Sequence, residues 1–253
     1  MIYNMDFLIS AMVILLLILW HFLGQKRAED LNNRVFLFFA VLGTADVVAE
    51  FFTNYYITSY NSDMENAAVI VTTIFYLLQA LLPVTFIFYI QTLHEQKIIS
   101  AKKMFISGVP TLVLISVILT NPFTEKLFSF DVTAGYVKGP WYLLMYVSAL
   151  GHFAVALLLI LLWRKKLGPQ KEKILLEIFV ISGVGVVLQM FCQSLLMTGF
   201  GMSLGILALF ITINNPNANL DSLTGLYNHL YLTRKMGELI ASGKSFHIIT
   251  VYL

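Results

Sequence analysis

Seven long apolar runs, separated by short polar segments, dominate this sequence and restrict how it can fold. The hydrocarbon core of a bilayer is about 30 Å thick, so a helix rising about 1.5 Å per residue needs roughly 20 apolar residues to cross it. Lipid cannot pair with exposed backbone groups, and the length of the runs and their lack of alternation favour α-helices over barrel strands. The predicted spans cover approximately residues 5–23, 35–56, 67–93, 104–120, 141–163, 174–197 and 200–213.

The composition agrees with a membrane protein. Of the 253 residues, 58% are hydrophobic and only 12% are charged, which is far from the average soluble domain. The formal net charge of +2 is too small to indicate a nucleic-acid partner. The single cysteine, Cys192, excludes an internal disulfide framework and any multi-cysteine metal site.

The distribution of Lys and Arg predicts the orientation, because cytoplasmic loops carry an excess of these residues. The N-terminus and the loops after the second, fourth and sixth predicted spans hold only Lys126 and Lys138, whereas the other loops are rich in Lys and Arg. We therefore predict an all-α integral membrane bundle of seven transmembrane helices, with the N-terminus outside and the C-terminus inside. The alternative is that the short run over residues 200–213 forms a hairpin that does not cross, which would leave the C-terminal end outside. The basic residues in the loops after the first, third and fifth spans are Lys26, Arg27, Arg34, Lys97, Lys102, Lys103, Arg164, Lys165, Lys166, Lys171 and Lys173.

Ionisable side chains inside predicted spans are candidates for function, because each costs about 2.5 to 3.5 kcal/mol to insert at the centre of a membrane. Asp46 and Glu50 lie four residues apart, on one face of the second span. Two carboxylates this close repel, so we expect one to be protonated or both to share a cation or a donor. With His152 of the fifth span, they form a candidate ligand or proton site. The alternative is that Asp46 and Glu50 are satisfied by neighbouring helices or face an outer water cavity, and that His152 is only hydrogen-bonded. Gln79, Gln189 and Gln193 are expected to hydrogen-bond across the bundle.

The segment 121–140 is the longest predicted piece outside the membrane. It is rich in aromatic residues, and residues 131–135 are typical of a turn between two short strands. This segment is expected either to cap the bundle or to cover a ligand pocket. The predicted seventh span has no lysine for a retinal Schiff base, and no internal repeat indicates a transporter, so a sensor is the remaining class.

The predicted N-out bundle, with the segments Leu119-Thr120-Asn121-Pro122 and Lys138-Gly139-Pro140, resembles the seven-transmembrane N-terminal region of certain bacterial histidine kinases. The resemblance covers roughly residues 1–215. In bacteria that region also precedes GGDEF domains. The resemblance implies a multi-pass receptor in the inner (cytoplasmic) membrane, with the lipid bilayer as a partner and an unidentified extracellular or membrane-borne ligand.

The segment 221–228 fits the pattern D-x-L-T-G-L-x-N and resembles the start of GGDEF domains, the family of diguanylate cyclases. The matching residues are Asp221, Leu223, Thr224, Gly225, Leu226 and Asn228, and we interpret them as structural. The family usually has arginine after the asparagine, and His229 stands there, which puts a contact to Asp221 in doubt. We divide the chain into a sensor domain, residues 1–216, and the start of a GGDEF domain, residues 217–253.

Periodicity predicts an amphipathic helix over residues 229–240 and a buried strand over 246–253, which is how a cytoplasmic α/β GGDEF-like domain begins. The resemblance implies Mg²⁺, GTP and a homodimer for the full-length protein, with cyclic di-GMP as product. The family's metal-binding aspartate and its G-G-D-E-F signature follow the strand, so residues 1–253 alone are expected to hold no catalytic residue and no metal ligand. The alternative is a degenerate domain that binds nucleotide or a partner without catalysis.

Overall fold

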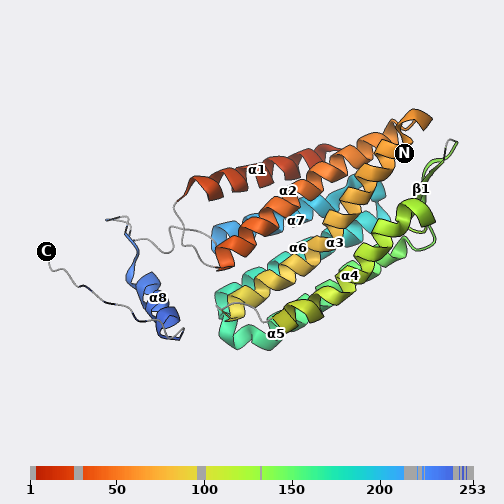
Figure 1. Cartoon of the computed structure of the whole chain (residues 1–253). Helices are drawn as coiled ribbons and strands as arrows, with labels where there is room; N and C mark the ends of the chain where they lie inside the picture. Colours follow the sequence, from red (N-terminus) through yellow and green to blue (C-terminus); the bar gives the residue numbers. More distant parts are fainter. Residues whose placement is uncertain are drawn as a thin grey trace.

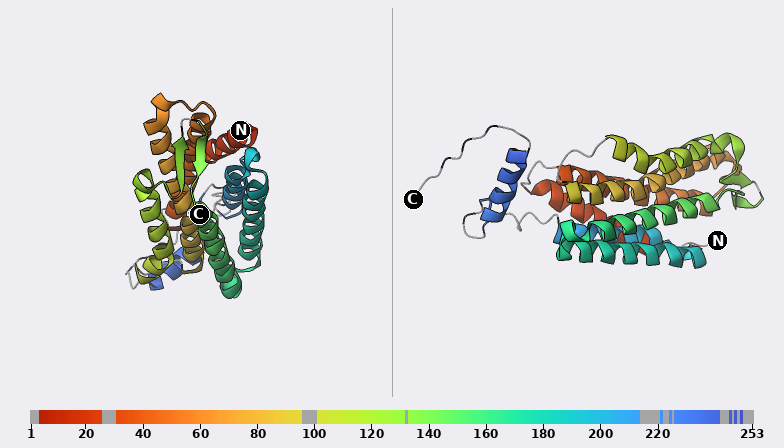
Figure 2. Two further views of the ribbon diagram at one scale, coloured as in Figure 1. Left: turned by 90° about the vertical axis from the view of Figure 1, so that its right-hand side faces the viewer. Right: turned by 90° about the horizontal axis from the view of Figure 1, so that it is seen from below.

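The computed structural model describes residues 4–25, 31–95, 101–131, 133–213 and 226–241, with residues 221, 224, 245, 247 and 249, and gives the backbone alone for residues 101–107. Long helices run side by side in this part of the chain and form an elongated bundle (Figure 1). A small hairpin lies at one end, and α8 lies beyond the other. Figure 2 shows the same bundle from the hairpin end and from below.

The helices follow the predicted apolar runs. They are α1 Asp6–Gly24, α2 Leu31–Thr58, α3 Glu65–Glu95, α4 Ala101–Thr124, α5 Leu143–Leu167, α6 Pro169–Phe191, α7 Met197–Thr212 and α8 His229–Ala241, with short 3-10 turns at Ser62–Met64 and Gln193–Leu195. Among the described residues, five helices are long and apolar enough to cross a membrane. They are α1, α2, α5, α6 and the segment Ser62–His94, which contains most of α3. Two shorter apolar helical segments are Gly108–Thr124 and Met197–Thr212. These helices are compatible with a multi-pass membrane protein.

One predicted boundary is wrong. We expected the turn before the last apolar run at Thr198-Gly199, but α6 ends at Phe191 and α7 begins at Met197. The chain reverses over the residues between, where Leu196 adopts a left-handed conformation with φ 48°. Gly199 is buried inside α7 instead of marking a loop, because helices α2 and α7 approach closely there.

Helices α2, α3, α5, α6 and α7 pack in a closed ring. Each contacts the next in that order, and α7 returns to contact α2. Helix α1 packs outside the ring against α2 and α7, and α4 packs outside it against α3 and α5. The ring therefore surrounds an interior, to which residues far apart in the sequence contribute.

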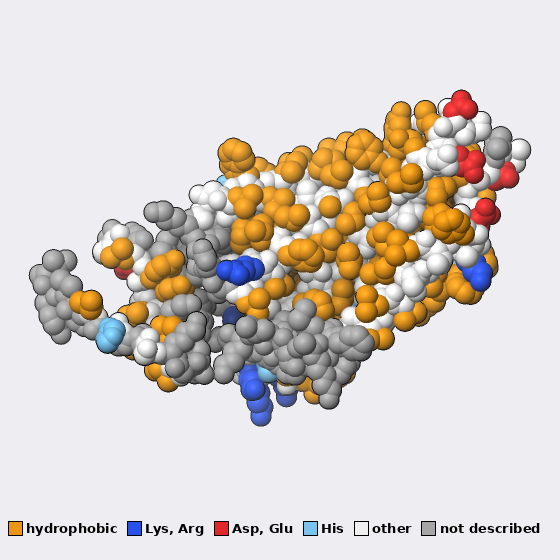
Figure 3. All heavy atoms as spheres, in the orientation of Figure 1, with side chains coloured by type: hydrophobic (Ala, Val, Ile, Leu, Met, Phe, Trp, Pro, Cys, Tyr) orange, Lys and Arg blue, Asp and Glu red, His pale blue; other side chains and the backbone are white. Residues whose placement is uncertain are grey.

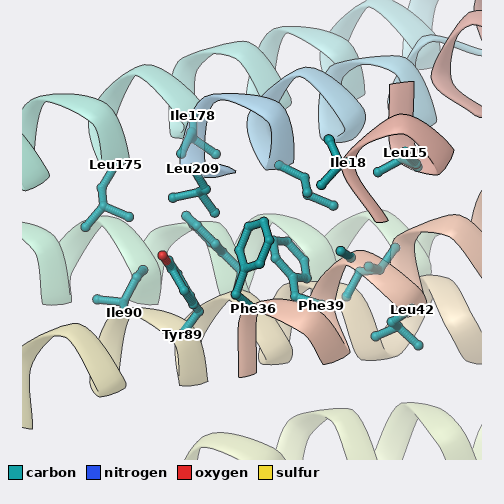
Figure 4. Close-up of a cluster of buried hydrophobic side chains, with 14 of the residues drawn as sticks. Leu15, Ile18, Phe36, Phe39, Leu42, Tyr89, Ile90, Leu175, Ile178 and Leu209 are labelled. Carbon is teal, nitrogen blue, oxygen red and sulfur yellow. The ribbon is translucent and has the colours of Figure 1, made fainter. Parts of the chain in front are cut away.

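The largest apolar core fills the part of this interior away from the hairpin. Phe36 of α2 contacts the rings of Phe22 of α1, Tyr89 of α3 and Phe210 of α7 at centroid distances of 5.1, 6.2 and 6.3 Å. Figure 4 shows Phe36 and Tyr89 between helices that also contribute Leu175, Ile178 and Leu209. Inside a membrane, close packing of such large side chains stabilises helix contacts, so this core holds α1, α2, α3 and α7 together.

The hairpin confirms the predicted pair of short strands. Strand β1 (Phe128–Asp131) pairs antiparallel with β2 (Gly135–Lys138), and it lies across the end of the bundle (Figure 2, left). In the turn, the Asp131 carboxylate accepts hydrogen bonds from the Thr133 hydroxyl and from the backbone N–H groups of Thr133 and Ala134, at 2.5, 2.8 and 2.8 Å. These donors lower the pKa of Asp131.

Asn121, at the end of α4, holds the start of this hairpin. Its side chain is 1% exposed. Its Nδ2 donates to the carbonyl oxygen of Phe128 at 2.9 Å, and its Oδ1 accepts from the N–H groups of Leu127 and Phe128 at 2.7 and 3.3 Å. Gly139 follows the hairpin and must be a glycine, because a Cβ there would lie 2.2 Å from the Lys126 carbonyl oxygen.

Charge and apolar surface are distributed along the bundle in a consistent way. Its long sides expose large apolar side chains, such as Leu17, Val113, Leu158 and Val180, each more than half exposed. Acidic side chains gather at the hairpin end, and most of the visible Lys and Arg side chains lie toward the other end (Figure 3). Lys173 and Glu177 of α6 form an exposed ion pair, with their charged atoms 3.8 Å apart.

Helix α8 confirms the predicted helix of the C-terminal segment. Its first turn is capped by Asn228, whose Oδ1 accepts a hydrogen bond from the Tyr231 N–H at 3.0 Å. The predicted strand over residues 246–253 lies almost entirely outside the described residues.

A polar cavity inside the helical ring

A cavity of about 180 Å³ lies inside the ring, and all five ring helices line it. Leu114 of α4 and two residues of β2, Tyr136 and Lys138, also line it, as do Tyr142 before α5 and Leu196 before α7. The cavity therefore extends from the hairpin end into the bundle. Its polar lining contains the three ionisable residues that the sequence marked as a candidate site, Asp46, Glu50 and His152.

One face of α2 supplies the acidic wall. Asp46, Glu50 and Thr53 recur at helical spacing, all line the cavity, and they are 3%, 2% and 3% exposed. Neither carboxyl group forms an ion pair with a described residue. Among the described residues, Asp46 Oδ1 and Thr53 Oγ1 have no hydrogen-bond partner. Buried polar atoms are usually hydrogen-bonded, so these two oxygens indicate a site that a further group can complete.

Thr53 differs from other threonines of the bundle. Thr44, Thr73 and Thr85 each donate their hydroxyl to the carbonyl oxygen four residues earlier in their own helix, at 2.7–2.8 Å. This local bond is the usual way for a threonine to satisfy its hydroxyl in an apolar helix. Thr53 does not make it, because its hydroxyl oxygen has no hydrogen-bond partner among the described residues. The Thr53 hydroxyl is thus left for the cavity.

Glu50 connects the acidic wall to α6 and α7. The Gln189 side chain lies within hydrogen-bonding range of the Glu50 carboxyl group, and Gln189 Oε1 accepts from the Thr198 N–H at 2.7 Å. A Cβ added to Gly199 would lie 3.0 Å from Glu50 Oε2. The acid on α2 therefore touches the first turn of α7 directly and through one amide.

Four tyrosines and a lysine line the hairpin end of the cavity. The hydroxyl groups of Tyr76 on α3 and Tyr136 on β2 are 2.5 Å apart and share a hydrogen bond. Those of Tyr142 and Tyr146 are 3.4 Å apart. Lys138 Nζ lies 4.4 Å from the centroid of the Tyr142 ring, and partial burial lowers the pKa of Lys138. Aromatic rings therefore surround the single Lys or Arg among the residues that line the cavity.

His152 is held by hydrogen bonds on both ring nitrogens. Nδ1 lies 2.7 Å from the carbonyl oxygen of Ser148, so it carries the proton and donates to it. Nε2 lies 2.9 Å from Thr111 Oγ1 and shares a hydrogen bond with this hydroxyl. His152 is 6% exposed. The bonds tie α5 to α4 and hold the imidazole ring in the cavity wall.

The structure brings Asp46, Glu50 and His152 to one cavity, together with Gln79 and Gln189. The side chain of Gln193 lies outside the described residues. Sequence analysis missed Thr53, although its helical spacing from Asp46 and Glu50 could have revealed it. It did not single out Tyr136 and Lys138, although it expected the segment 121–140 either to cap the bundle or to cover a ligand pocket, and both residues line the cavity.

The motif residues of the C-terminal segment make local contacts. Asp221 Oδ1 accepts from the N–H and the hydroxyl of Thr224 at 3.0 and 2.9 Å, and the Asp221 N–H donates to the Leu226 carbonyl oxygen at 2.7 Å. The Leu226 side chain is exposed. Leu223 and Gly225 lie outside the described residues. His229 is exposed at the start of α8.

In the part of the chain that the structure describes, no group of three or more His, Cys, Asp or Glu residues could hold a metal ion. Comparison with protein-family models, with curated proteins and with solved structures finds no significant match for this chain.

Proposed function

We propose that this chain is the membrane sensor of a receptor, in which occupancy of the polar cavity controls a GGDEF-type diguanylate cyclase on the cytoplasmic side. The observation that carries the proposal is the buried pair Asp46 and Glu50, which lines a cavity and contacts α7. Buried carboxyl groups are costly and are retained where they bind or transmit something. Helix α7 is the last helix before the GGDEF-like motif that begins at Asp221.

In this proposal all seven helices α1–α7 cross the inner membrane, with the hairpin outside and the C-terminus in the cytoplasm. The charge distribution supports this orientation. Exposed Arg34, Arg164, Lys165 and Lys166 lie at helix ends away from the hairpin, and the hairpin end is mainly acidic (Figure 3). This is the asymmetry that the positive-inside rule describes.

The signal passes from the cavity to α7 by a rigid-body shift. Glu50 lies against Gly199, and its partner Gln189 holds the Thr198 N–H. A change in what the Glu50 carboxyl group binds therefore alters contacts at the first turn of α7. Only residues 213–220 separate α7 from Asp221, and a connector this short is too constrained to act as a free tether. A shift of α7 then reorients two output domains in a homodimer.

The output we propose is synthesis of cyclic di-GMP from GTP, with Mg²⁺ held by residues of the full-length protein. The match of residues 221–228 to the GGDEF start pattern supports it. A second candidate is an output domain that binds nucleotide or a partner without catalysis. His229 favours this candidate, because it replaces the arginine that usually follows the motif.

The test measures cyclic di-GMP formed from GTP and Mg²⁺ by membranes containing the full-length protein. Two to four residues inserted after Pro216 should uncouple synthesis from the signal, because they rotate and displace the output domain relative to α7. The matched control is the same insertion after Lys97, between α3 and α4. Regulated synthesis in the Pro216 variant would refute rigid coupling. No synthesis by the wild-type protein, with nucleotide still bound, would favour the second candidate.

The orientation has its own measurement. A reporter enzyme that is active only in the cytoplasm, fused after Leu253, should be active, and the same reporter inserted in the hairpin turn should be silent. The opposite result would overturn the proposed topology and the cytoplasmic output with it.

A further inference from the structure

We propose that the cavity binds a small organic ammonium ion, a primary amine with a compact apolar or aromatic body, and that its nitrogen lies at the acidic wall formed by Asp46, Glu50 and Thr53. The inference deepens the proposed sensor function, because it names the chemical class of the ligand at the same site.

Charge is the first argument. Two carboxyl groups, each at least 97% buried, line the cavity without an ion pair to any described residue. The lining lysine, Lys138, lies over the Tyr142 ring at the hairpin end. Buried charges are stable when they are paired and hydrogen-bonded. A cation that enters the cavity supplies the charge that the acidic wall lacks.

Hydrogen bonding is the second argument. An ammonium group carries three donors and no acceptor. Asp46 Oδ1 and Thr53 Oγ1 are buried oxygens without a partner among the described residues, and both can accept. The Glu50 carboxyl group between them has a second oxygen besides the one that its Gln189 contact uses. The wall therefore offers at least two oxygens without a described partner that can accept hydrogen bonds from an ammonium group.

Size and lining separate an organic cation from a metal ion. An engineered apolar cavity of about 150 Å³ holds benzene, so about 180 Å³ accommodates a benzene ring with a short substituent. Much of the lining is apolar or aromatic, including Phe75, Tyr76, Phe86 and Phe153, which suits the apolar body of an organic cation. Among the described residues, no group of three acidic, His or Cys side chains exists for a metal.

The experiment compares three probes of similar shape on the purified full-length protein in lipid nanodiscs. Benzylamine, benzyl alcohol and benzoate share one ring and differ in charge, and binding is followed by the thermal unfolding midpoint and by calorimetry. Benzylamine should bind at millimolar concentration or below, and the neutral and anionic analogues should bind at least ten-fold more weakly. Butylamine and cyclohexylmethylamine extend the series of amines, and NaCl and MgCl₂ serve as inorganic cations.

Variants locate the site. Asp46→Asn keeps the shape and removes the charge, and should weaken benzylamine binding about ten- to hundred-fold, the range expected for a charged hydrogen bond. Thr53→Val removes one acceptor and should weaken it about two- to ten-fold. The matched control is Asp63→Asn, because Asp63 is exposed in the 3-10 turn before α3 and does not line the cavity.

Equal binding of benzylamine and benzyl alcohol, no binding of any of the amines, or unchanged affinity in Asp46→Asn would overturn the inference. Stabilisation by NaCl or MgCl₂ but by none of the amines would assign the site to an inorganic cation and would also overturn it. The assay is independent of cyclic di-GMP. Amine binding without any change in synthesis contradicts the sensor function alone, whereas regulated synthesis without amine binding contradicts this inference alone.

Discussion

The packing of α6 against α7 makes a prediction that two neighbouring glycines can test in opposite directions. A Cβ added at Gly185 of α6 would lie 3.1 Å from the Met197 carbonyl oxygen and 3.7 Å from the Gly201 Cα atom. A Cβ added at Gly183, two residues earlier in the same helix, would have nothing within 4 Å. Substitution by alanine is therefore the same chemical change in two environments.

Whether Gly185→Ala raises or lowers the free energy of unfolding depends on whether Met197 can move. Met197 is the first residue of α7, directly after the left-handed Leu196, and the N–H of the next residue is held by Gln189. Moving it strains the turn and that hydrogen bond. We expect Gly185→Ala to lower the free energy of unfolding by about 1–2 kcal/mol, within the range for overpacked sites. Gly183→Ala should raise it by up to about 1 kcal/mol, the difference in helix propensity.

The assay is equilibrium unfolding in mixed micelles with increasing denaturing detergent, followed by circular dichroism. The two variants should differ by about 1–3 kcal/mol in the free energy of unfolding, with wild type between them. A Gly185→Val variant should be less stable than Gly185→Ala, because its γ carbons reach further toward α7. Equal stabilities for Gly183→Ala and Gly185→Ala would refute the close backbone approach of the two helices.

Three further predictions concern the hairpin and its contact with the cavity. Asn121→Ala should destabilise the protein by about 2–4 kcal/mol in the same unfolding assay, because three hydrogen bonds to the hairpin are lost in a buried site; an effect below 0.5 kcal/mol would contradict this role. The lowered pKa of Asp131 means that its contribution to hairpin stability is fully present above its unfolded pKa of about 3.9 and is lost as pH falls through the folded pKa. Amide exchange in the hairpin turn should therefore accelerate on acidification in wild type, after correction for intrinsic rates, and Asp131→Asn should remove this pH dependence. A double-mutant cycle of Tyr76→Phe and Tyr136→Phe should give a coupling energy of about 0.5–1.5 kcal/mol, and additive effects would show that the hydroxyl groups do not interact.

The positions of the helices could be predicted from the sequence, because charged residues and prolines bound the apolar runs closely. The turn between α6 and α7 could not. Thr198-Gly199 has the composition of a loop, but Gly199 lies within α7 and its missing side chain leaves room for the Glu50 carboxyl group. Sequence alone cannot distinguish a glycine that bends the chain from one that admits a neighbouring helix, since both use the missing side chain.

The candidate site was predictable in part for a similar reason. Placing a carboxyl group in an apolar helix costs free energy, so Asp46 and Glu50 can be recognised as candidates from the sequence. A threonine does not, because most threonines in such helices satisfy themselves locally, as Thr44 does. Thr53 became a candidate only when the structure showed that its buried hydroxyl oxygen has no hydrogen-bond partner among the described residues. Tyr136 depends on a long-range contact that no local pattern encodes.

Part of the cavity wall belongs to β2, a strand that pairs with one neighbour and packs on the end of the bundle. A two-stranded hairpin is only marginally stable by itself, and such elements open far more often than packed helices do. The residence time of an occupant should accordingly follow the opening rate of the hairpin. Mutations that tighten the hairpin should slow entry and escape together while leaving the equilibrium affinity nearly unchanged.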